Sequence, residues 1–181
     1  AAKLTRIGSG LPAYYNDEVI IPAMMSRGVS LEDARTYNII GCVEPQAHGK
    51  TDGWHDAAFF NMCRPLELVF SNGMEGGEQV GPRTGEISDF RTFDDFYNAY
   101  KEQMDYFIKL LVNADNSIDV AHAERCPLPF QSCMIDDCIG KGKSLQEGGA
   151  IYNFTGPQGF GIANVADSLM AVKTLVYDQH K

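Results

Sequence analysis

The sequence predicts a mixed α/β fold with a layered or barrel-type architecture. Two short β-prone runs, at 36–41 and 148–156, are each followed by a loop and then by a segment with helical periodicity. Further helical segments lie between these two runs. This repeated order of strand, loop and helix is typical of α/β architectures. The chain has 181 residues, which suits one domain with a sizeable core.

The first part of the chain is expected to contain two helices and a strand. Pro22 lies inside the first helical segment and Gly28 closes it. Ser30 and Asp33 resemble an N-capping box at the start of the second helix. The expected elements are a helix at 14–28, a short helix at 31–36, a buried strand at 36–41 and a loop at 42–53.

The next part is expected to be one helix followed by a loop. Apolar residues recur with helical spacing over 55–72, and Gly73 is a natural C-terminal residue for this helix. Pro65 is expected to kink it. The polar, glycine-rich segment 73–91 is predicted to be a loop and is the best internal boundary if the chain has one.

The last part combines helices with a second strand. Thr92 and Asp95 mark another helix start. The run TGPQGFG at 155–161 has glycines in the order GxxGxG instead of GxGxxG, so it predicts a tight strand-to-helix turn and not a dinucleotide site. The expected elements are a helix at 92–114, short helices at 116–125 and 129–140, a buried strand at 148–156 and a final helix at 161–181.

The composition argues against two classes of partner. The net charge is −9 and the pI about 4.8, so nucleic acid and anionic membranes would repel the chain. No apolar run approaches the roughly 18 residues of a membrane span. No charged-then-apolar leader opens the sequence. We therefore expect a globular protein that binds neither nucleic acid nor membrane.

The cysteines indicate a reducing compartment. Their number is odd, their spacing is irregular and no CxxC pair occurs, so a disulfide framework is not expected. We predict a cytoplasmic location. Cys133 and Cys138 lie on an apolar pattern and are expected to pack in the core. The five cysteines are Cys42, Cys63, Cys126, Cys133 and Cys138.

Cys42 and Glu44 are candidate catalytic residues. Residues two apart on extended backbone project to the same side, so the thiol and the carboxylate would face one cavity. A carboxylate disfavours the nucleophilic thiolate. A neutral thiol can instead lose and regain a hydrogen atom, while the glutamate acts as a base toward the substrate. On spacing alone, a buried structural cysteine and a solvated glutamate are the commoner explanation.

His55 and Asp56 are candidate substrate-binding residues. They are expected at the start of the helix over 55–72, where Asp56 could simply favour the helix dipole. The functional interpretation makes them partners of a substrate hydroxyl, or a proton donor. Together with Cys42 and His48 they match no common zinc spacing, so no metal site is predicted.

Two stretches resemble a known family. The sequence GCVEPQ, followed by GWHDAAFFN, is similar to the cysteine loop of the glycyl radical enzymes, which are pyruvate formate-lyase-like. The match is closest to the branch of glycerol (diol) dehydratases and trans-4-hydroxyproline dehydratases. The later stretch GGAIYNFTGPQGFGIANVADSL resembles another segment of that branch. The resemblance runs from about Tyr14 to the end of the chain.

The resemblance implies a fold and a radical mechanism. The fold would be part of a ten-stranded α/β barrel, with the cysteine loop pointing into it. A glycine radical would take a hydrogen atom from Cys42, whose thiyl radical then abstracts hydrogen from a small hydroxylated substrate. Glu44 would be the base, and Asp56, with His55 beside it, would bind hydroxyl groups while water is eliminated. Phe59 or Phe60 could wall the pocket or pack in a helix core.

The resemblance also implies what lies outside the chain. No RVxGY-like glycyl radical motif is present, the chain does not begin with Met, and its end continues a helical pattern. We therefore expect residues 1–181 to be a central fragment of the barrel domain, inactive alone and lacking the glycyl radical domain. No cofactor is expected on this chain. A radical S-adenosylmethionine activase would install the oxygen-sensitive radical, and the full-length enzyme would be a homodimer.

Several alternatives remain open at this level. Pyruvate formate-lyases carry two adjacent cysteines, whereas Gly41 precedes Cys42 here, so a formate C-acetyltransferase-type reaction is disfavoured. Another glycyl radical C–N or C–S lyase would share the same cysteine loop. A cysteine hydrolase using Cys42 and His55, or an inactive α/β structural fragment, would belong to a different class.

Overall fold

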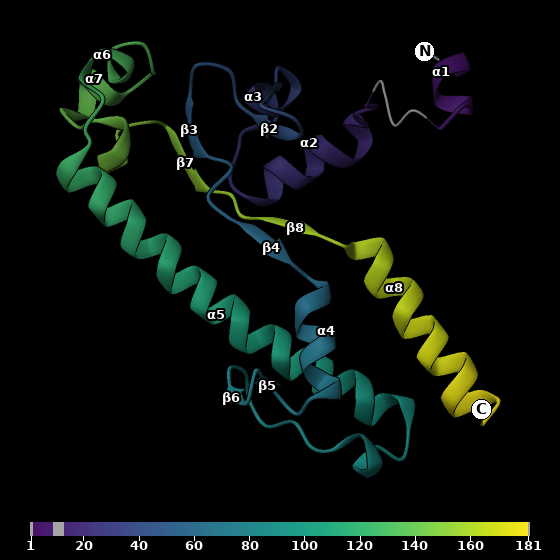
Figure 1. The fold of residues 1–181 in the computed structure, drawn as a ribbon. Helices are drawn as coiled ribbons and strands as arrows, with labels where there is room; N and C mark the ends of the chain where they lie inside the picture. Colours follow the sequence, from purple (N-terminus) through teal and green to yellow (C-terminus); the bar gives the residue numbers. More distant parts are fainter. Residues whose placement is uncertain (1, 9–12, 181) are drawn as a thin grey trace. The chain divides into compact units, whose positions relative to one another are not determined.

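The computed structural model describes residues 2–8 and 13–180, which form two compact units (Figure 1). The first unit contains the described residues up to Gly53 and Pro127–Phe154. The second contains Trp54–Cys126 and the described residues from Thr155 onward. Both helices and strands occur, so the mixed α/β class is confirmed. The boundary expected at 73–91 is wrong, because that whole segment belongs to the second unit.

Three helices open the first unit: α1 (Ala2–Arg6), α2 (Asp17–Ser26) and α3 (Leu31–Arg35). The side chain of Asn16 accepts the Glu18 N–H at 3.0 Å and so caps α2. Pro22 lies within α2, as predicted. The predicted cap of α3 is also confirmed, because Ser30 Oγ accepts the Asp33 N–H at 3.1 Å. The buried core beside them consists of Met24, Val29, Ala34 and Ala47.

A β-hairpin follows α3. Strand β1 (Asn38–Ile40) pairs antiparallel with β2 (Glu44–Gln46), with Asn38 opposite Gln46 and Ile40 opposite Glu44. The prediction of a strand at 36–41 is confirmed, but its burial is not: Asn38 and Ile39 are only partly buried and Ile40 is exposed. The prediction of a loop over 42–53 is wrong, because β2 and β3 (Thr51–Trp54) both lie in it. Pro45 is compatible with β2, because in a two-stranded hairpin each strand is an edge strand and does not use every backbone N–H for pairing.

An ion pair connects the two sides of this hairpin's base. Lys50 Nζ lies 2.5 Å from Asp33 Oδ1, and the Tyr152 hydroxyl donates to Asp33 Oδ2 at 2.7 Å. The Ser30 N–H in turn donates to the Tyr152 oxygen at 3.1 Å. The Lys50 ammonium, and after it the Tyr152 hydroxyl, hold the pKa of Asp33 below its ordinary value of 3.8. The network therefore connects α3 to Lys50, which follows the hairpin, and to Tyr152, about 100 residues later in the chain.

Substitution Asp33→Asn is expected to loosen α3 at neutral pH. Because the folded-state pKa is depressed, this stabilisation is present above 3.8 and is lost as the pH falls through the lower folded value. Amide hydrogen exchange of the peptide covering 30–36, in the full-length protein, should therefore be faster in the variant at pH 7. The exposed neighbour Glu32, changed to Gln, is the matched control. Equal exchange in both variants at pH 7 would contradict the role of the ion pair.

Two further strand pairs each join segments that lie about 100 residues apart in the sequence. Strand β3 pairs with β7 (Tyr152–Thr155), and β4 (Phe59–Asn61) pairs with β8 (Gln158–Phe160) in parallel, with Phe60 opposite Gly159. The strand expected at 148–156 is thus confirmed in its second half, but the expected burial is wrong, because the residues of β7 alternate between partly buried and exposed. The helix expected over 55–72 is wrong in its first half, because residues 59–61 are taken up by pairing with β8.

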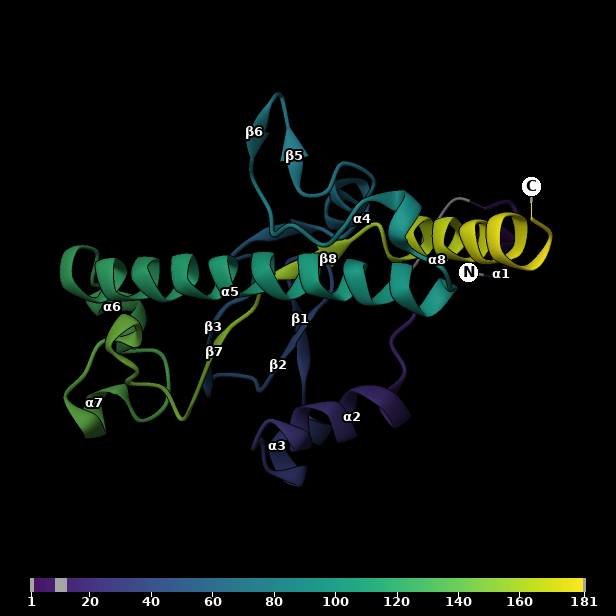
Figure 2. The ribbon, with the colours of Figure 1, turned by 90° about the horizontal axis from the view of Figure 1, so that it is seen from below.

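Three helices form the core of the second unit: α4 (Cys63–Phe70), α5 (Phe93–Arg125) and α8 (Ile162–Ala171). Figure 2 shows α5 as one unbroken helix, with the hairpin β5 (Met74–Glu75) and β6 (Glu78–Gln79) beside α4. The capping box of Thr92 and Asp95 is confirmed. The predicted break after residue 114 is wrong. The buried core residues are Leu66, Val69, Phe96, Ala99, Tyr100 and Val165.

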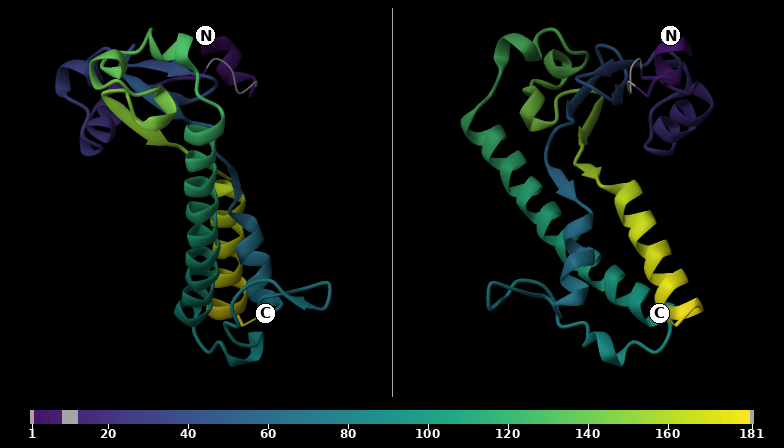
Figure 3. Two further views of the ribbon diagram at one scale, coloured as in Figure 1. Left: turned by 90° about the vertical axis from the view of Figure 1, so that its left-hand side faces the viewer. Right: turned by 45° about the vertical axis from the view of Figure 1, so that its right-hand side comes forward.

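Pro65 does not kink α4. It lies in the first turn, where a helix needs no backbone donor, because the helix begins at Cys63. Gly161, at φ +84°, makes the predicted strand-to-helix turn before α8. A Cβ there would lie 2.6 Å from Cys63 Sγ, so glycine allows the starts of α4 and α8 to approach (Figure 3). The π-helical segment η3 (Val172–Asp178) continues α8, and Lys181, where the predicted helix ended, lies outside the described residues.

Short elements complete the chain. The 3₁₀ turn η1 (Ile87–Asp89) precedes α5, and the predicted helix at 129–140 is broken into α6 (Pro129–Ser132) and α7 (Cys138–Lys141). The 3₁₀ turn η2 (Leu145–Glu147) precedes β7. Across residues 2–8 and 13–180, no helix has both the length and the apolarity that a bilayer span requires.

Candidate active site

Cys42 lies at the tip of the β1–β2 hairpin. Gly41, Cys42 and Val43 form the turn between the strands, and the cysteine is exposed. Gly41 adopts φ +58°, a backbone region that L side chains disfavour. A Cβ on Gly41 would also lie 2.9 Å from Glu44 Oε2. Glycine is therefore required here both by the backbone angle and by the approach of the glutamate.

The Glu44 side chain folds back over this turn. Its Oε2 accepts the N–H groups of Cys42 and Val43, each at 2.8 Å, and the residue is only 7% exposed. Charge-assisted hydrogen bonds from backbone amides fix a carboxylate strongly. The spacing argument expected the two side chains to project together from extended backbone. This is wrong in detail, because Cys42 lies in a turn and Glu44 reaches back across it.

The burial of Cys42 and Glu44 is the reverse of what a purely structural role for the two residues predicted. That interpretation expected a buried cysteine and a solvated glutamate, whereas Cys42 is exposed and Glu44 is buried. A buried carboxylate is uncommon unless it is hydrogen-bonded, as this one is. The hairpin thus presents a thiol on the outside of a turn whose amides are held by an acid.

Tyr15 is a third residue at this turn, which the sequence did not suggest. Its hydroxyl donates to the Cys42 carbonyl oxygen at 2.5 Å. Tyr15 directly precedes Asn16, the N-cap of α2. The only sequence signal for its position is this cap, which says where the helix starts but not what the tyrosine contacts.

His55 and Asp56 lie in the second unit, in a bulge and not at a helix start. Trp54 O accepts the Gly156 N–H at 2.9 Å, and Ala58 O accepts the Gln158 N–H at 2.8 Å. Residues 55–57 lie between the two acceptors, whereas Pro157 alone lies between the two donors. The strand path through His55 is therefore longer by two residues and must bulge. Such bulges redirect side chains and are frequent near active sites.

The bulge gives Asp56 a defined partner. Gln158 Nε2 donates to Asp56 Oδ1, and Asp56 is exposed. The expected explanation of Asp56 as a helix N-terminal acid is wrong, because the nearest helix begins at Cys63.

Phe59 and Phe60 lie in β4, so neither packs in a helix core. Phe59 is 67% exposed and Phe60 is half-buried.

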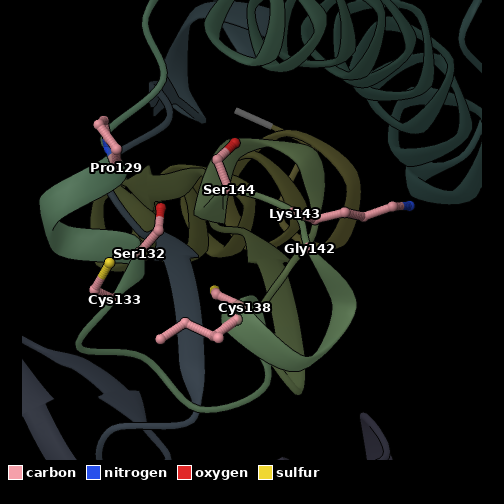
Figure 4. Close-up of a pocket in the computed structure, with 8 residues that line it drawn as sticks. Pro129, Ser132, Cys133, Cys138, Gly142, Lys143 and Ser144 are labelled. Atoms are coloured by element: carbon pink, nitrogen blue, oxygen red, sulfur yellow. The ribbon is translucent and has the colours of Figure 1, made fainter.

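A separate pocket of about 210 Å³ lies in the first unit around α6 and α7 (Figure 4). Burial raises the pKa of the Cys138 thiol, as in a structural cysteine. Cys138 is in the core as predicted, but Cys133 is exposed. None of the four predicted site residues lines the pocket. Its lining consists of Pro129, Ser132, Cys133, Cys138, Ile139, Gly142, Lys143 and Ser144.

Comparison with known proteins assigns the family. The family model described as pyruvate formate lyase-like matches residues 1–181, the whole chain. The chain belongs to the pyruvate formate lyase-like family. The resemblance of the GCVEPQ and GGAIYNFTG stretches is thereby confirmed, and it extends over more of the chain than expected.

Individual members of the pyruvate formate lyase-like family are similar to the chain throughout. The structure titled 1,2-propanediol dehydration in Roseburia inulinivorans is 68% identical, with a TM-score of 0.91 over 99% of this chain and 22% of that one. The glycerol-bound B12-independent glycerol dehydratase from Clostridium butyricum is 64% identical, with a TM-score of 0.91 over 98% of this chain and 23% of that one. The (2S)-3-sulfopropanediol dehydratase of Klebsiella oxytoca is 42% identical over 97% of this chain and 22% of its own length.

The pyruvate formate lyase-like chain spans between a fifth and a quarter of these relatives. Within residues 2–8 and 13–180, no group of three or more His, Cys, Asp and Glu side chains could hold a metal ion. Cys42 and Glu44 lie at the hairpin turn of the first unit, and His55 and Asp56 lie in the bulge of the second.

Proposed function

We propose that the full-length protein is a radical lyase that eliminates water from a small diol. The observation that carries this proposal is the Cys42 turn: the thiol of Cys42 is exposed, and the buried carboxylate of Glu44 accepts the N–H groups of the turn. The two structures at 68% and 64% identity bear titles of propanediol dehydration and glycerol dehydration, which favours a diol as the substrate.

Cys42 is the hydrogen-atom carrier in this proposal. As a thiyl radical it takes a hydrogen atom from the hydroxyl-bearing carbon of the diol, so that its S–H bond forms while a C–H bond breaks. After water has left, the same S–H returns a hydrogen atom to the product radical. The product is an aldehyde, and one diol gives one aldehyde and one water.

Glu44 is the general base. Removing the proton from the hydroxyl on the radical carbon makes that carbon a stronger electron donor, so that the bond to the neighbouring hydroxyl breaks. The proton that Glu44 took then completes the leaving water molecule, and the carboxylate is restored. Glu44 is confined beside Cys42 by its two amide hydrogen bonds, so base and hydrogen acceptor are positioned together.

Asp56, with His55 beside it, is proposed to hold the substrate hydroxyl groups. Asp56→Asn should lower kcat/KM by about 10- to 100-fold, the cost of a hydrogen bond to a charged group, mainly through a higher KM. Asp94→Asn, at an exposed acid in the first turn of α5, is the matched control. Steady-state kinetics of the activated full-length enzyme measures both, and an unchanged KM in the Asp56 variant would remove it from the binding site.

The remaining machinery lies outside this chain in the proposal. A radical stored on a glycine, installed by a radical S-adenosylmethionine activase, would supply the unpaired electron. An exposed thiol at the tip of a hairpin fits such an exchange, because it is accessible to a group on another segment. Residues 1–181 would be a central piece of a ten-stranded α/β barrel, with the Cys42 turn pointing inward. We further propose a homodimer in the cytoplasm, inactivated by oxygen.

The test is anaerobic activation of the full-length enzyme followed by a panel of substrates. The panel contains 1,2-propanediol, glycerol, 3-sulfopropanediol, trans-4-hydroxyproline and isethionate, with aldehyde and released sulfite as readouts. We expect dehydration of a diol and little turnover of isethionate. Sulfite release with no dehydration would instead support the alternative of a C–S lyase.

A further inference from the structure

We propose that Tyr15 is a positioning residue for Cys42: its hydroxyl fixes the carbonyl end of the hairpin turn, so that the thiol keeps one direction. This inference rests on the proposed function, since it concerns the orientation of the hydrogen-atom carrier. It adds a residue from outside the cysteine loop, more than 20 positions earlier in the chain.

The first step is that side chains hold both backbone groups of Cys42. Its N–H donates to Glu44 Oε2 at 2.8 Å, and its carbonyl oxygen accepts from the Tyr15 hydroxyl at 2.5 Å. The turn lies beyond the last rung of the β1–β2 ladder, between Ile40 and Glu44. Without these two side chains, the turn would have to satisfy its peptide groups with water, and its orientation would be set by the ladder alone.

The second step is that the Tyr15 hydroxyl is carried by a fixed element. Asn16 caps α2 immediately after it, and Met24 of α2 is in the buried core, with Ile20 and Ile21 packed against that core. The next residue, Asp17, accepts the Tyr37 hydroxyl at 2.7 Å. Tyr37 directly precedes β1, so Tyr15 and Asp17, two residues apart at the start of α2, contact the tip and the base of the same hairpin.

The third step concerns what hydrogen-atom transfer requires. Displacement of reacting atoms by about 1 Å can cost 100-fold in rate, because the reacting atoms must meet at close range. A hairpin held only by its ladder can rock about its base, and the tip moves farthest. The contact from Tyr15 is made to the backbone of that tip, and so it restrains the tip.

The experiment uses Tyr15→Phe in the full-length enzyme, with Tyr14→Phe as the matched control. Tyr14 is the exposed neighbour whose hydroxyl lies 3.1 Å from Thr5 Oγ1. We expect kcat of Tyr15→Phe to fall about tenfold with KM within about twofold, and the primary deuterium isotope effect to rise. In the resting, unactivated protein, amide exchange of the peptide covering 40–46 should accelerate. Tyr14→Phe should change none of these.

Two results would overturn the proposal. One is a kcat within twofold of the unsubstituted enzyme; the other is a fall in kcat with unchanged amide exchange at 40–46. Either result leaves the function of Cys42 untouched, because that is tested by its own substitution. Turnover by a Cys42→Ala enzyme would instead remove the proposed function, whatever Tyr15 does. A general loss of stability would show as faster exchange throughout the chain, and would also count against a local role for the hydroxyl.

Discussion

Replacement of Cys42 by alanine in the full-length enzyme should reduce turnover by at least about 10⁴-fold, because no other group on the turn can carry a hydrogen atom. The folded hairpin should persist, since Cys42 is exposed and its hydrogen bonds are made by its backbone. The stored radical should still form, because the activase would act on another segment. Electron paramagnetic resonance and product analysis on the same sample measure both quantities.

The matched control for this substitution is Cys126→Ala. Cys126 is also exposed, and it follows the end of α5. It should keep the activity of the unsubstituted enzyme and the same radical yield. Residual turnover in the Cys42 variant would exclude the thiyl mechanism. Rapid alkylation of Cys42 in air, in the unsubstituted protein, would favour the cysteine hydrolase.

Two substitutions of Glu44 should separate its two contributions. Glu44→Gln removes the base, which is worth about 10²- to 10⁴-fold in general base catalysis, but its amide oxygen can still accept the Cys42 and Val43 N–H groups. Glu44→Ala removes the base and also leaves these amides without their partner. We therefore expect both variants to lose turnover, and only the alanine variant to loosen the turn.

Amide hydrogen exchange of the peptide covering 40–46 distinguishes the two variants. It should be close to that of the unsubstituted protein in Glu44→Gln and faster in Glu44→Ala. Glu67→Gln, at an exposed glutamate of α4 that pairs with Arg64, controls for removal of a carboxylate elsewhere. Full activity in Glu44→Gln would show that the carboxylate is not the base.

Local signals in the sequence predicted the fold where the structure is made locally. The capping residues Ser30 and Thr92 marked α3 and α5 correctly, because a cap contacts only the first turn of its own helix. The glycine-rich run before α8 was correctly interpreted as a strand-to-helix turn. Residues 55–61 were misassigned to a helix, because β4 owes its conformation to β8, about 100 residues later.

The candidate site divides in the same way. Cys42 and Glu44 were predicted as candidate site residues from their local motif. The hydrogen bonds of Glu44 to the turn were not predicted, because the spacing argument assumed an extended backbone. Tyr15 was missed because its contact with Cys42 depends on the packing of α2. The break expected after residue 114 is absent from α5, where Ser117 Oγ donates to the Asn113 carbonyl at 2.8 Å and the helix continues.

The clearance at Gly41 bears on how this branch could give rise to another chemistry. Acyl transfer needs a second cysteine adjacent to the first, and Gly41 is the position that precedes Cys42. A side chain there would start 2.9 Å from Glu44 Oε2 and would adopt a disfavoured φ of +58°. A single mutation from glycine to cysteine would therefore displace the glutamate that organises the turn. Two adjacent cysteines at this turn would require the backbone angle of residue 41 and the position of the acid to change together.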